Sequence, residues 1–214
     1  MKKLLLILSV IPFISYSQTE EHQLLYKALN YHDPNEAWSE LKAVFYFTET
    51  RPTGPDRKTT FELDNSTGKW KVNRNDEEVY EINGEEAVVI KGDKESDRGV
   101  MLRNYYLYLW GLPMKLKDAS TPGITLAPNK MVINRNCYVF RVPYEAETYY
   151  FYIDKESGRM LQYKFYKDEE AGKGELIKLE DEIIIQGIRI PKKRSWYTLP
   201  EMKYLGTDIL DRAE

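Results

Sequence analysis

Residues 136–167, NCYVFRVPYEAETYYFYIDKESGRMLQYKFYK, contain three runs with the pattern of β-strands, joined by two turns. In the middle run Tyr149 and Phe151 point to one side of a strand, and Tyr150 and Tyr152 point to the other, because successive strand side chains alternate. Both faces are therefore rich in apolar surface. An antiparallel sheet with one face in water shows a cleaner polar stripe, so we expect the second face to be covered as well.

The turn between the second and third runs is residues 154–158, DKESG. Its aspartate can accept hydrogen bonds from the backbone that follows, and Gly158 can adopt a positive φ, so the two runs form a hairpin. Residues 136–142 alternate in the same way before Pro143 ends the run. This pattern predicts a third antiparallel neighbour.

The N-terminus has the pattern of a secretory signal peptide over residues 1–17, with two lysines, an apolar run and small residues before Gln18. The apolar run Leu4–Ile14 is too short to span a membrane comfortably, and no later stretch approaches about 18 apolar residues. We expect one domain over residues 18–214, soluble, periplasmic or secreted, and without a lipid anchor, because no cysteine lies at the cleavage site.

Composition excludes several classes of protein. The formal net charge is −3, so nothing in the composition suggests a nucleic-acid partner. Cys137 is the single cysteine and cannot form an internal disulfide, so the fold must depend on its core. Its position among strand residues predicts a buried structural thiol.

Periodicity and turn residues predict two helical regions among many strands. The first region is a helix over residues 20–30, followed by a short helix carrying Ala37, Trp38 and Leu41 that Asp33 caps. The second is a helix over residues 96–110, ended by Gly111-Leu112-Pro113. Residues 115–128 are expected to form a loop. Strands are predicted in two groups, the first before the second helical region and the second after the loop: 41–49, 57–64, 69–74, 77–82 and 85–91, then 130–135, 136–142, 147–154, 158–168, 175–185, 187–199 and 202–210. A flat sheet of that many strands would curl or close.

Three segments carry a resemblance to a known family: YYFYIDKESGRMLQYKFY, with its strand, Asp-x-x-Ser-Gly turn and strand; EIIIQGIRIPKKRSWY, with its Gly-Ile-x-Ile-Pro hairpin; and RNYYLYLWGLPMKLKD. The order of elements and these segments resemble the superfamily of periplasmic lipoprotein carriers and outer-membrane lipoprotein receptors (LolA/LolB-like), in an uncharacterised secreted branch. The resemblance implies an α+β fold, a strongly curved antiparallel half-barrel of about ten to twelve strands with helices covering the concave face.

The resemblance also implies a hydrophobic cavity between the sheet and the helices that accepts a lipid or a lipoprotein acyl chain. Residues 100–116 would open and close over it as a lid. The expected ligand-binding residues are the aromatic side chains of the strand runs and of the helix: Tyr138, Phe140, Tyr149, Phe151, Tyr163, Phe165, Tyr105 and Trp110.

No pattern supports catalysis, a metal or a cofactor. His32-Asp33 lacks the further ligands of a zinc site, Asp33 is better explained as a helix cap, and no histidine near Cys137 in sequence would activate it. No Gly-x-Ser-x-Gly motif is present. Residues 192–194, Lys-Lys-Arg, could contact anionic headgroups or could be a solvated edge.

Three functions therefore stay open. The first is a non-enzymatic carrier of an apolar ligand. The second is an envelope structural or interaction module with a fully packed core, no small-molecule ligand and an envelope protein partner. The third, a hydrolase, lacks a nucleophile and base.

Overall fold

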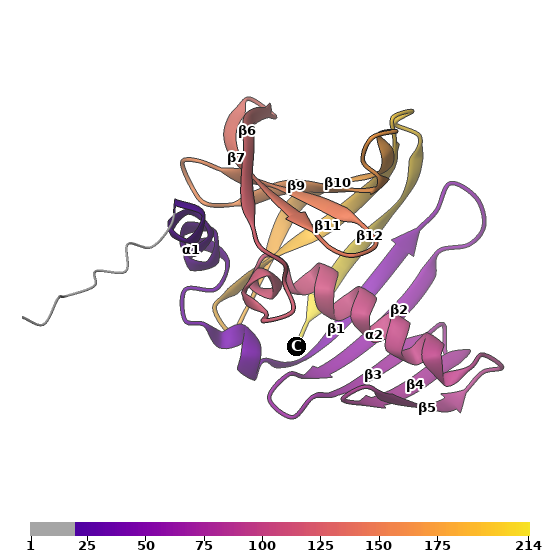
Figure 1. Cartoon of the computed structure of the whole chain (residues 1–214). Coiled ribbons are helices and arrows are strands. Elements are labelled where there is room, and N and C mark those ends of the chain that lie inside the picture. Colours follow the sequence, from indigo (N-terminus) through magenta and orange to yellow (C-terminus); the bar gives the residue numbers. More distant parts are fainter. Residues whose placement is uncertain (1–19) are drawn as a thin grey trace, which may run out of the picture.

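The computed structural model describes residues 20–214, and the predicted signal peptide lies outside them. Twelve antiparallel strands form one open, curved sheet, which confirms the predicted number (Figure 1). The strand order is β5-β4-β3-β2-β1-β12-β11-β10-β9-β8-β7-β6, so strands consecutive in sequence are paired except β5 and β6, which form the two edges, and β1 also pairs with β12. The strands are β1 Lys42–Thr50, β2 Arg57–Asp64, β3 Lys69–Arg74, β4 Glu78–Asn83, β5 Glu86–Lys91, β6 Thr125–Val132, β7 Arg135–Pro143, β8 Thr148–Asp154, β9 Met160–Asp168, β10 Lys173–Ile185, β11 Ile188–Leu199 and β12 Tyr204–Ala213.

The two predicted helical regions are confirmed. They are α1 (Glu20–His32) with the 3-10 turn η1 (Ala37–Glu40), and α2 (Ser96–Gly111) with the 3-10 turn η2 (Met114–Lys117). The carboxylate of Asp33 accepts hydrogen bonds from the backbone N–H groups that begin η1, at 2.8 and 2.9 Å, so the predicted cap is present. Helix α2 lies across the face formed by β1–β5 (Figure 1).

The expectation for residues 115–128 and 130–135 is wrong at its boundaries. Strand β6 already begins at Thr125, and its turn to β7 is formed by Ile133 and Asn134, whose φ angles are 48° and 59°. A β-branched residue at positive φ is unusual, so sequence propensity placed the turn too late. The DKESG turn is as predicted, because Asp154 accepts a 2.6 Å hydrogen bond from the Ser157 hydroxyl and Gly158 has a φ of 86°.

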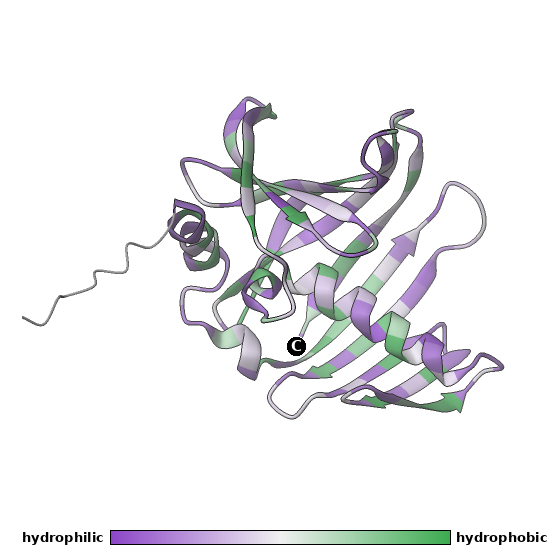
Figure 2. Cartoon of the chain, viewed as in Figure 1, coloured by the Kyte–Doolittle hydropathy of each residue, from purple (hydrophilic) through white to green (hydrophobic). Residues whose placement is uncertain are grey.

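Alternation along the strands divides the sheet into two faces, as the colours of β1–β4 in Figure 2 show. In β1, Ala43, Phe45 and Phe47 are buried, and the register places Leu63 and Phe61 of β2 opposite the first two. Residues paired across an antiparallel ladder share a face. These side chains therefore belong to the core beneath α2.

The second face of the sheet is also covered, as the aromatic runs predict, and it is covered in two ways. Val132, Cys137, Val139 and Tyr152 form a separate buried cluster. Burial raises the pKa of the Cys137 thiol to about 11, as expected for a structural cysteine. Elsewhere on this face the Lys164 ammonium lies 4.8 and 4.6 Å from the ring centres of two neighbouring tyrosines, and its stem covers their apolar surface.

Close packing of α2 gives a first prediction, at Gly99. A methyl group at this position would lie 2.8 Å from Cδ1 of the buried Tyr80 and 3.0 Å from Cβ of Ala87. Gly99→Ala gains about 1 kcal/mol of helix propensity, but overpacking costs about 1–3 kcal/mol. We expect a net loss of stability in urea denaturation. Gly123→Ala, which has no neighbour within 4 Å, should change the free energy of unfolding by less than about 0.5 kcal/mol; a more stable Gly99→Ala variant would contradict this packing.

Candidate functional site

Six of the eight predicted ligand-binding residues lie on one face of three adjacent strands. The register pairs Phe140 with Phe151, Phe151 with Tyr163, and Tyr149 with Phe165, while Tyr138 follows on the same side of β7. Phe140, Phe151 and Tyr163 are completely buried, and Phe165 is nearly so. The structure thus brings these side chains together within a packed interior.

The two predicted residues of α2 lie over a different part of the sheet. The ring of Trp110 lies 4.6 Å from that of Phe47, and its other neighbour is the Arg194 guanidinium, 3.6 Å from the ring centre. Tyr105 donates a 2.6 Å hydrogen bond to Asp208 and stacks on Trp196. Both residues hold α2 against β1, β11 and β12.

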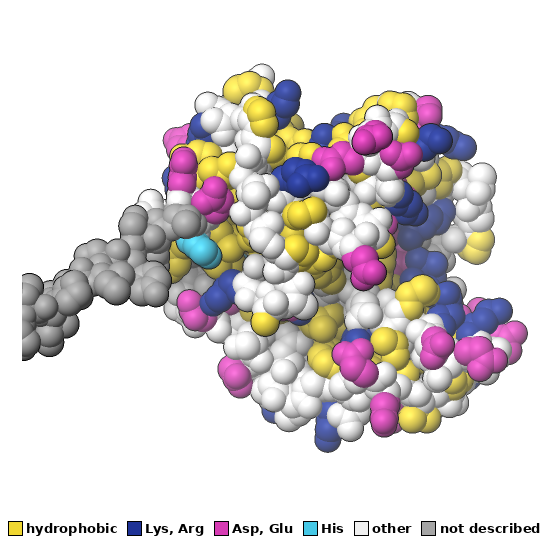
Figure 3. Space-filling view, viewed as in Figure 1, with side chains coloured by type: hydrophobic (Ala, Val, Ile, Leu, Met, Phe, Trp, Pro, Cys, Tyr) yellow, Lys and Arg dark blue, Asp and Glu magenta, His cyan; other side chains and the backbone are white. Residues whose placement is uncertain are grey.

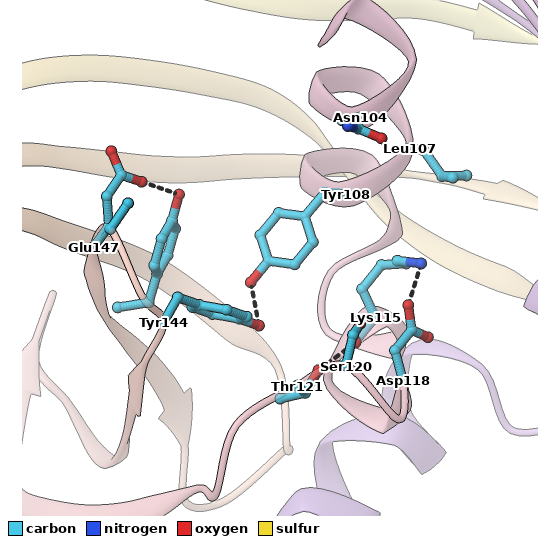
Figure 4. A pocket seen from close by; sticks show the side chains of 11 residues that line it. Asn104, Leu107, Tyr108, Lys115, Asp118, Ser120, Thr121, Tyr144 and Glu147 are labelled. Carbon is cyan, nitrogen blue, oxygen red and sulfur yellow. Dashed lines mark hydrogen bonds and ion pairs between the residues drawn. The ribbon is translucent and has the colours of Figure 1, made fainter. Parts of the chain in front are cut away.

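A cleft of about 430 Å³ opens beside the buried aromatic face, between the C-terminal half of α2 and the connection of β7 to β8. Its volume falls within the range of small-molecule sites, about 300–1,000 Å³. Of the predicted residues, Tyr149 lines it. The lining comes from α2, the segment after it and the β7–β8 connection: Asn104, Leu107, Tyr108, Lys115, Asp118, Ser120, Thr121, Tyr144, Ala146, Glu147 and Tyr149 (Figure 4).

Three tyrosine rings form one wall of this cleft. Tyr108, Tyr144 and Tyr149 meet pairwise edge to face, with ring centres 5.5–6.0 Å apart and interplanar angles of 77–87°. The hydroxyl of Tyr108 donates to that of Tyr144 at 2.8 Å, as Figure 4 shows. We refer to these three residues as the tyrosine cluster. Burial raises the pKa of Tyr108 and of Tyr149 far above the usual value, so both hydroxyls stay neutral.

The tyrosine cluster is in contact with the buried aromatic face. The ring of Tyr149 stacks on Phe165 at 5.1 Å and on Phe151 at 5.8 Å. A molecule in the cleft therefore contacts a ring whose other neighbours belong to the core.

The polar groups of the cleft lie in two places. Lys115 and Asp118 form an ion pair with each other, on the other side of Tyr108 from Glu147 in the view of Figure 4. Glu147 accepts a 2.9 Å hydrogen bond from the Tyr149 hydroxyl. Within residues 20–214 no lysine, arginine or histidine lies at ion-pair distance from Glu147. The cleft thus has one carboxylate that no cation neutralises.

A buried ionic network beneath α2 fixes the helix that carries Tyr108. The carboxylate of Glu49 is fully buried and accepts hydrogen bonds from Tyr106 of α2 and from Arg57. Arg74 lies 3.8 Å from the same carboxylate and 3.2 Å from the Tyr106 hydroxyl. Arg194, also fully buried, donates a 2.8 Å hydrogen bond to the carbonyl of Leu109 near the end of α2.

The sequence patterns above do not predict this network, although the sequence contains a signal for it. Glu49 continues the alternation of Ala43, Phe45 and Phe47, so it occupies an apolar position of β1. Arg74 has the same relation to Val72 on β3. A charged residue at a buried strand position indicates a partner on the facing element.

The basic run at residues 192–194 is not a continuous patch. Arg194 is fully buried, and Lys193 forms a 3.0 Å ion pair with Asp181. The possible contact of all three residues with anionic headgroups is therefore wrong, because alternation in β11 directs Arg194 into the core.

Two further expectations concern absences. Among the described residues, no helix is long and apolar enough to cross a membrane. Within 20–214, no group of three or more histidine, cysteine, aspartate or glutamate residues is arranged to hold a metal ion.

The fold is shared with solved structures of low sequence identity. A LolA superfamily protein from Nitrosomonas europaea is 11% identical, with a TM-score of 0.59 over 90% of this chain and 92% of that chain. A putative outer membrane lipoprotein-sorting protein domain from Vibrio parahaemolyticus is 8% identical, with a TM-score of 0.56 over 90% of each chain. A DUF1329 family protein from Desulfovibrio piger is 9% identical, with a TM-score of 0.53 over 90% of this chain and 92% of that one.

These likenesses define the fold, an open, curved antiparallel sheet shared with a LolA superfamily protein and a lipoprotein-sorting domain, and they confirm the predicted resemblance at that level. The model of a "Family of unknown function (DUF6503)" matches residues 86–211, more than half of the chain. The chain therefore belongs to the DUF6503 family. No curated protein matches it.

Proposed function

We propose that this protein is a non-enzymatic periplasmic or secreted carrier of an apolar ligand, a lipid or a lipoprotein acyl chain. In this proposal residues 1–17 are a signal peptide, residues 18–214 form one domain, and α2 covers the concave face of the sheet. The ligand enters at the cleft and its chain extends along the aromatic face of β7–β9. The names of the solved relatives, a LolA superfamily protein and a lipoprotein-sorting domain, support the proposal.

One observation supports it most strongly: Tyr149 lines the cleft, and its ring stacks on Phe165 and Phe151 of the aromatic core. Fully burying a large apolar side chain contributes roughly 1.5–3 kcal/mol, and an acyl chain that replaces contacts between aromatic rings regains a similar contribution. Apolar contacts between the rings are therefore replaced by apolar contacts between the rings and the acyl chain.

The buried network limits how the cleft opens. Moving residues 100–116 as a lid would break the hydrogen bonds that Glu49 and Arg194 make with α2. Hydrogen bonds to charged groups contribute about 1.5–3 kcal/mol each. We therefore place the moving part in residues 118–124, which follow η2 and are exposed or half-buried.

The test is native mass spectrometry of protein recovered without detergent from the periplasm of an expression host. We expect a stoichiometric adduct that organic extraction identifies as a lipid or an acylated molecule. An apo mass, together with failure to take up added fatty acids, would contradict the carrier function.

A second candidate function is an envelope interaction module without a small-molecule ligand. The observation in its favour is the filled interior, where one cluster of buried side chains runs from α1 through the sheet to α2. This module would co-purify with an envelope protein while excluding apolar dyes.

A further inference from the structure

We infer that the cleft selects an amphiphile with a positively charged ammonium head group. The tyrosine cluster and Glu147 bind this head group, while the alkyl chain of the ligand enters the aromatic core. This inference rests on the proposed carrier function and names the class of ligand. It is supported by ring geometry, by the charges of the cleft and by the surroundings of the carboxylate.

The ring geometry suits a cation. An ammonium group is attracted to the electron-rich face of an aromatic ring within about 6 Å of the ring centre, and quaternary ammonium ligands are commonly bound by several such rings. In the tyrosine cluster, rings that are nearly perpendicular to one another border a single cleft. The hydroxyls of Tyr108 and Tyr149 already donate to Tyr144 and Glu147, so neither offers its proton to an anionic head group.

The local charge also favours a cation. Lys115 is the basic residue of the cleft lining, and it is neutralised by Asp118. This leaves Glu147, whose carboxylate bonds only to the hydroxyl of Tyr149 among the described residues. A partly desolvated carboxylate strongly favours an opposite charge and disfavours an anionic head group.

A second carboxylate strengthens this field. Glu175 pairs with Phe165 in the ladder and thus belongs to the same face as Tyr149. Burial raises the pKa of Glu175, Lys167 lowers it, and the charge of Glu147 raises it further. The negative charge of Glu147 thus also acts on Glu175, and a cation bound beside Glu147 offsets it.

The charge of the whole molecule does not select the ligand. Figure 3 shows lysine, arginine, aspartate and glutamate side chains mixed over the visible face, with apolar side chains between them. The net charge is small for a chain of this length. Selectivity must then come from short-range contacts in the cleft, because exposed charges are screened beyond about 8–10 Å.

The experiment compares three amphiphiles with the same twelve-carbon chain: dodecyltrimethylammonium, dodecyl maltoside and dodecyl sulfate. Binding to the protein, purified from the periplasm and freed of co-purified lipid, is measured by calorimetry below the micelle concentration. We expect the ammonium compound to bind at least about tenfold more tightly than the other two. Glu147→Gln should reduce this preference to about threefold or less, because the amide carries no charge.

Two variants control the result. Glu145→Gln changes the same chemical group at an exposed position outside the cleft, and it should keep the full preference. Tyr144→Leu retains an apolar wall but removes one ring, and it should also weaken ammonium binding selectively. Thermal unfolding of each variant checks that it is folded.

The outcomes separate the two proposals. Equal affinity for all three amphiphiles would overturn the selection of a cation and leave the carrier function standing. A preference for dodecyl sulfate would do the same. Failure of all three to bind would overturn both.

Discussion

Glu49→Gln is expected to lower the free energy of unfolding by about 3–5 kcal/mol, because removal of one partner leaves buried charges uncompensated. Glu49 is fully buried, and Arg57 and Arg74 both lie against its carboxylate. An amide keeps the shape of the carboxylate but not its charge. Urea denaturation at neutral pH, followed by circular dichroism, measures the difference.

The matched control for this variant is Glu62→Gln. Glu62 lies on β2 but on the exposed face of the sheet, so its substitution should change stability by no more than about 0.5 kcal/mol. If the Glu49 variant lost less than about 1 kcal/mol, the network would contribute little and α2 would be held by apolar packing alone. The lid would then be free to include residues 100–116.

Acidification from pH 7 to pH 4 is expected to remove about 3 kcal/mol of stability through His32. This side chain is fully buried; its Nδ1 donates a 2.8 Å hydrogen bond to the carbonyl of Arg189, and its Nε2 accepts one of 3.0 Å from the N–H of Met160. Burial lowers the pKa of His32 to about 4, and the fields of nearby arginines act in the same direction. The imidazole is neutral in the folded protein at neutral pH.

The sign of the effect follows from the two states. The unfolded chain binds a proton at His32 below about pH 6.5, whereas the folded protein does so only below about pH 4. Between these values the unfolded state holds more protons, so stability rises with pH and is fully present above about pH 6.5.

His32→Gln should remove this part of the pH dependence, measured as the difference in urea midpoints between pH 7 and pH 4. His22→Gln, which changes an exposed histidine of the same helix, should leave it in place. A variant at His32 with the slope of the unmodified protein would show that other groups cause the loss. The arrangement also explains why His32 and Asp33 are not a metal pair, since both ring nitrogens bond to the backbone and Asp33 caps η1.

Part of the candidate site follows from the sequence. Alternation correctly placed Tyr149 and Phe151 on one side of β8 and predicted a hairpin that brings Tyr163 and Phe165 onto the same face. It did not decide which of these rings borders open space. Tyr144 directly follows Pro143, which ends a strand, and a residue in a turn has no periodicity to predict its contacts.

The sequence by itself determined most of the strands, both helical regions, the cap at Asp33 and the DKESG turn, because each depends on residues within a few positions of one another. Tertiary structure alone decided that β1 pairs with β12, that Glu49 meets Tyr106, and that Tyr108 meets Tyr144. These contacts join residues far apart in the chain, and they form only where the sheet and α2 pack together. The buried charges and the tyrosine cluster therefore depend on packing, which no local pattern encodes.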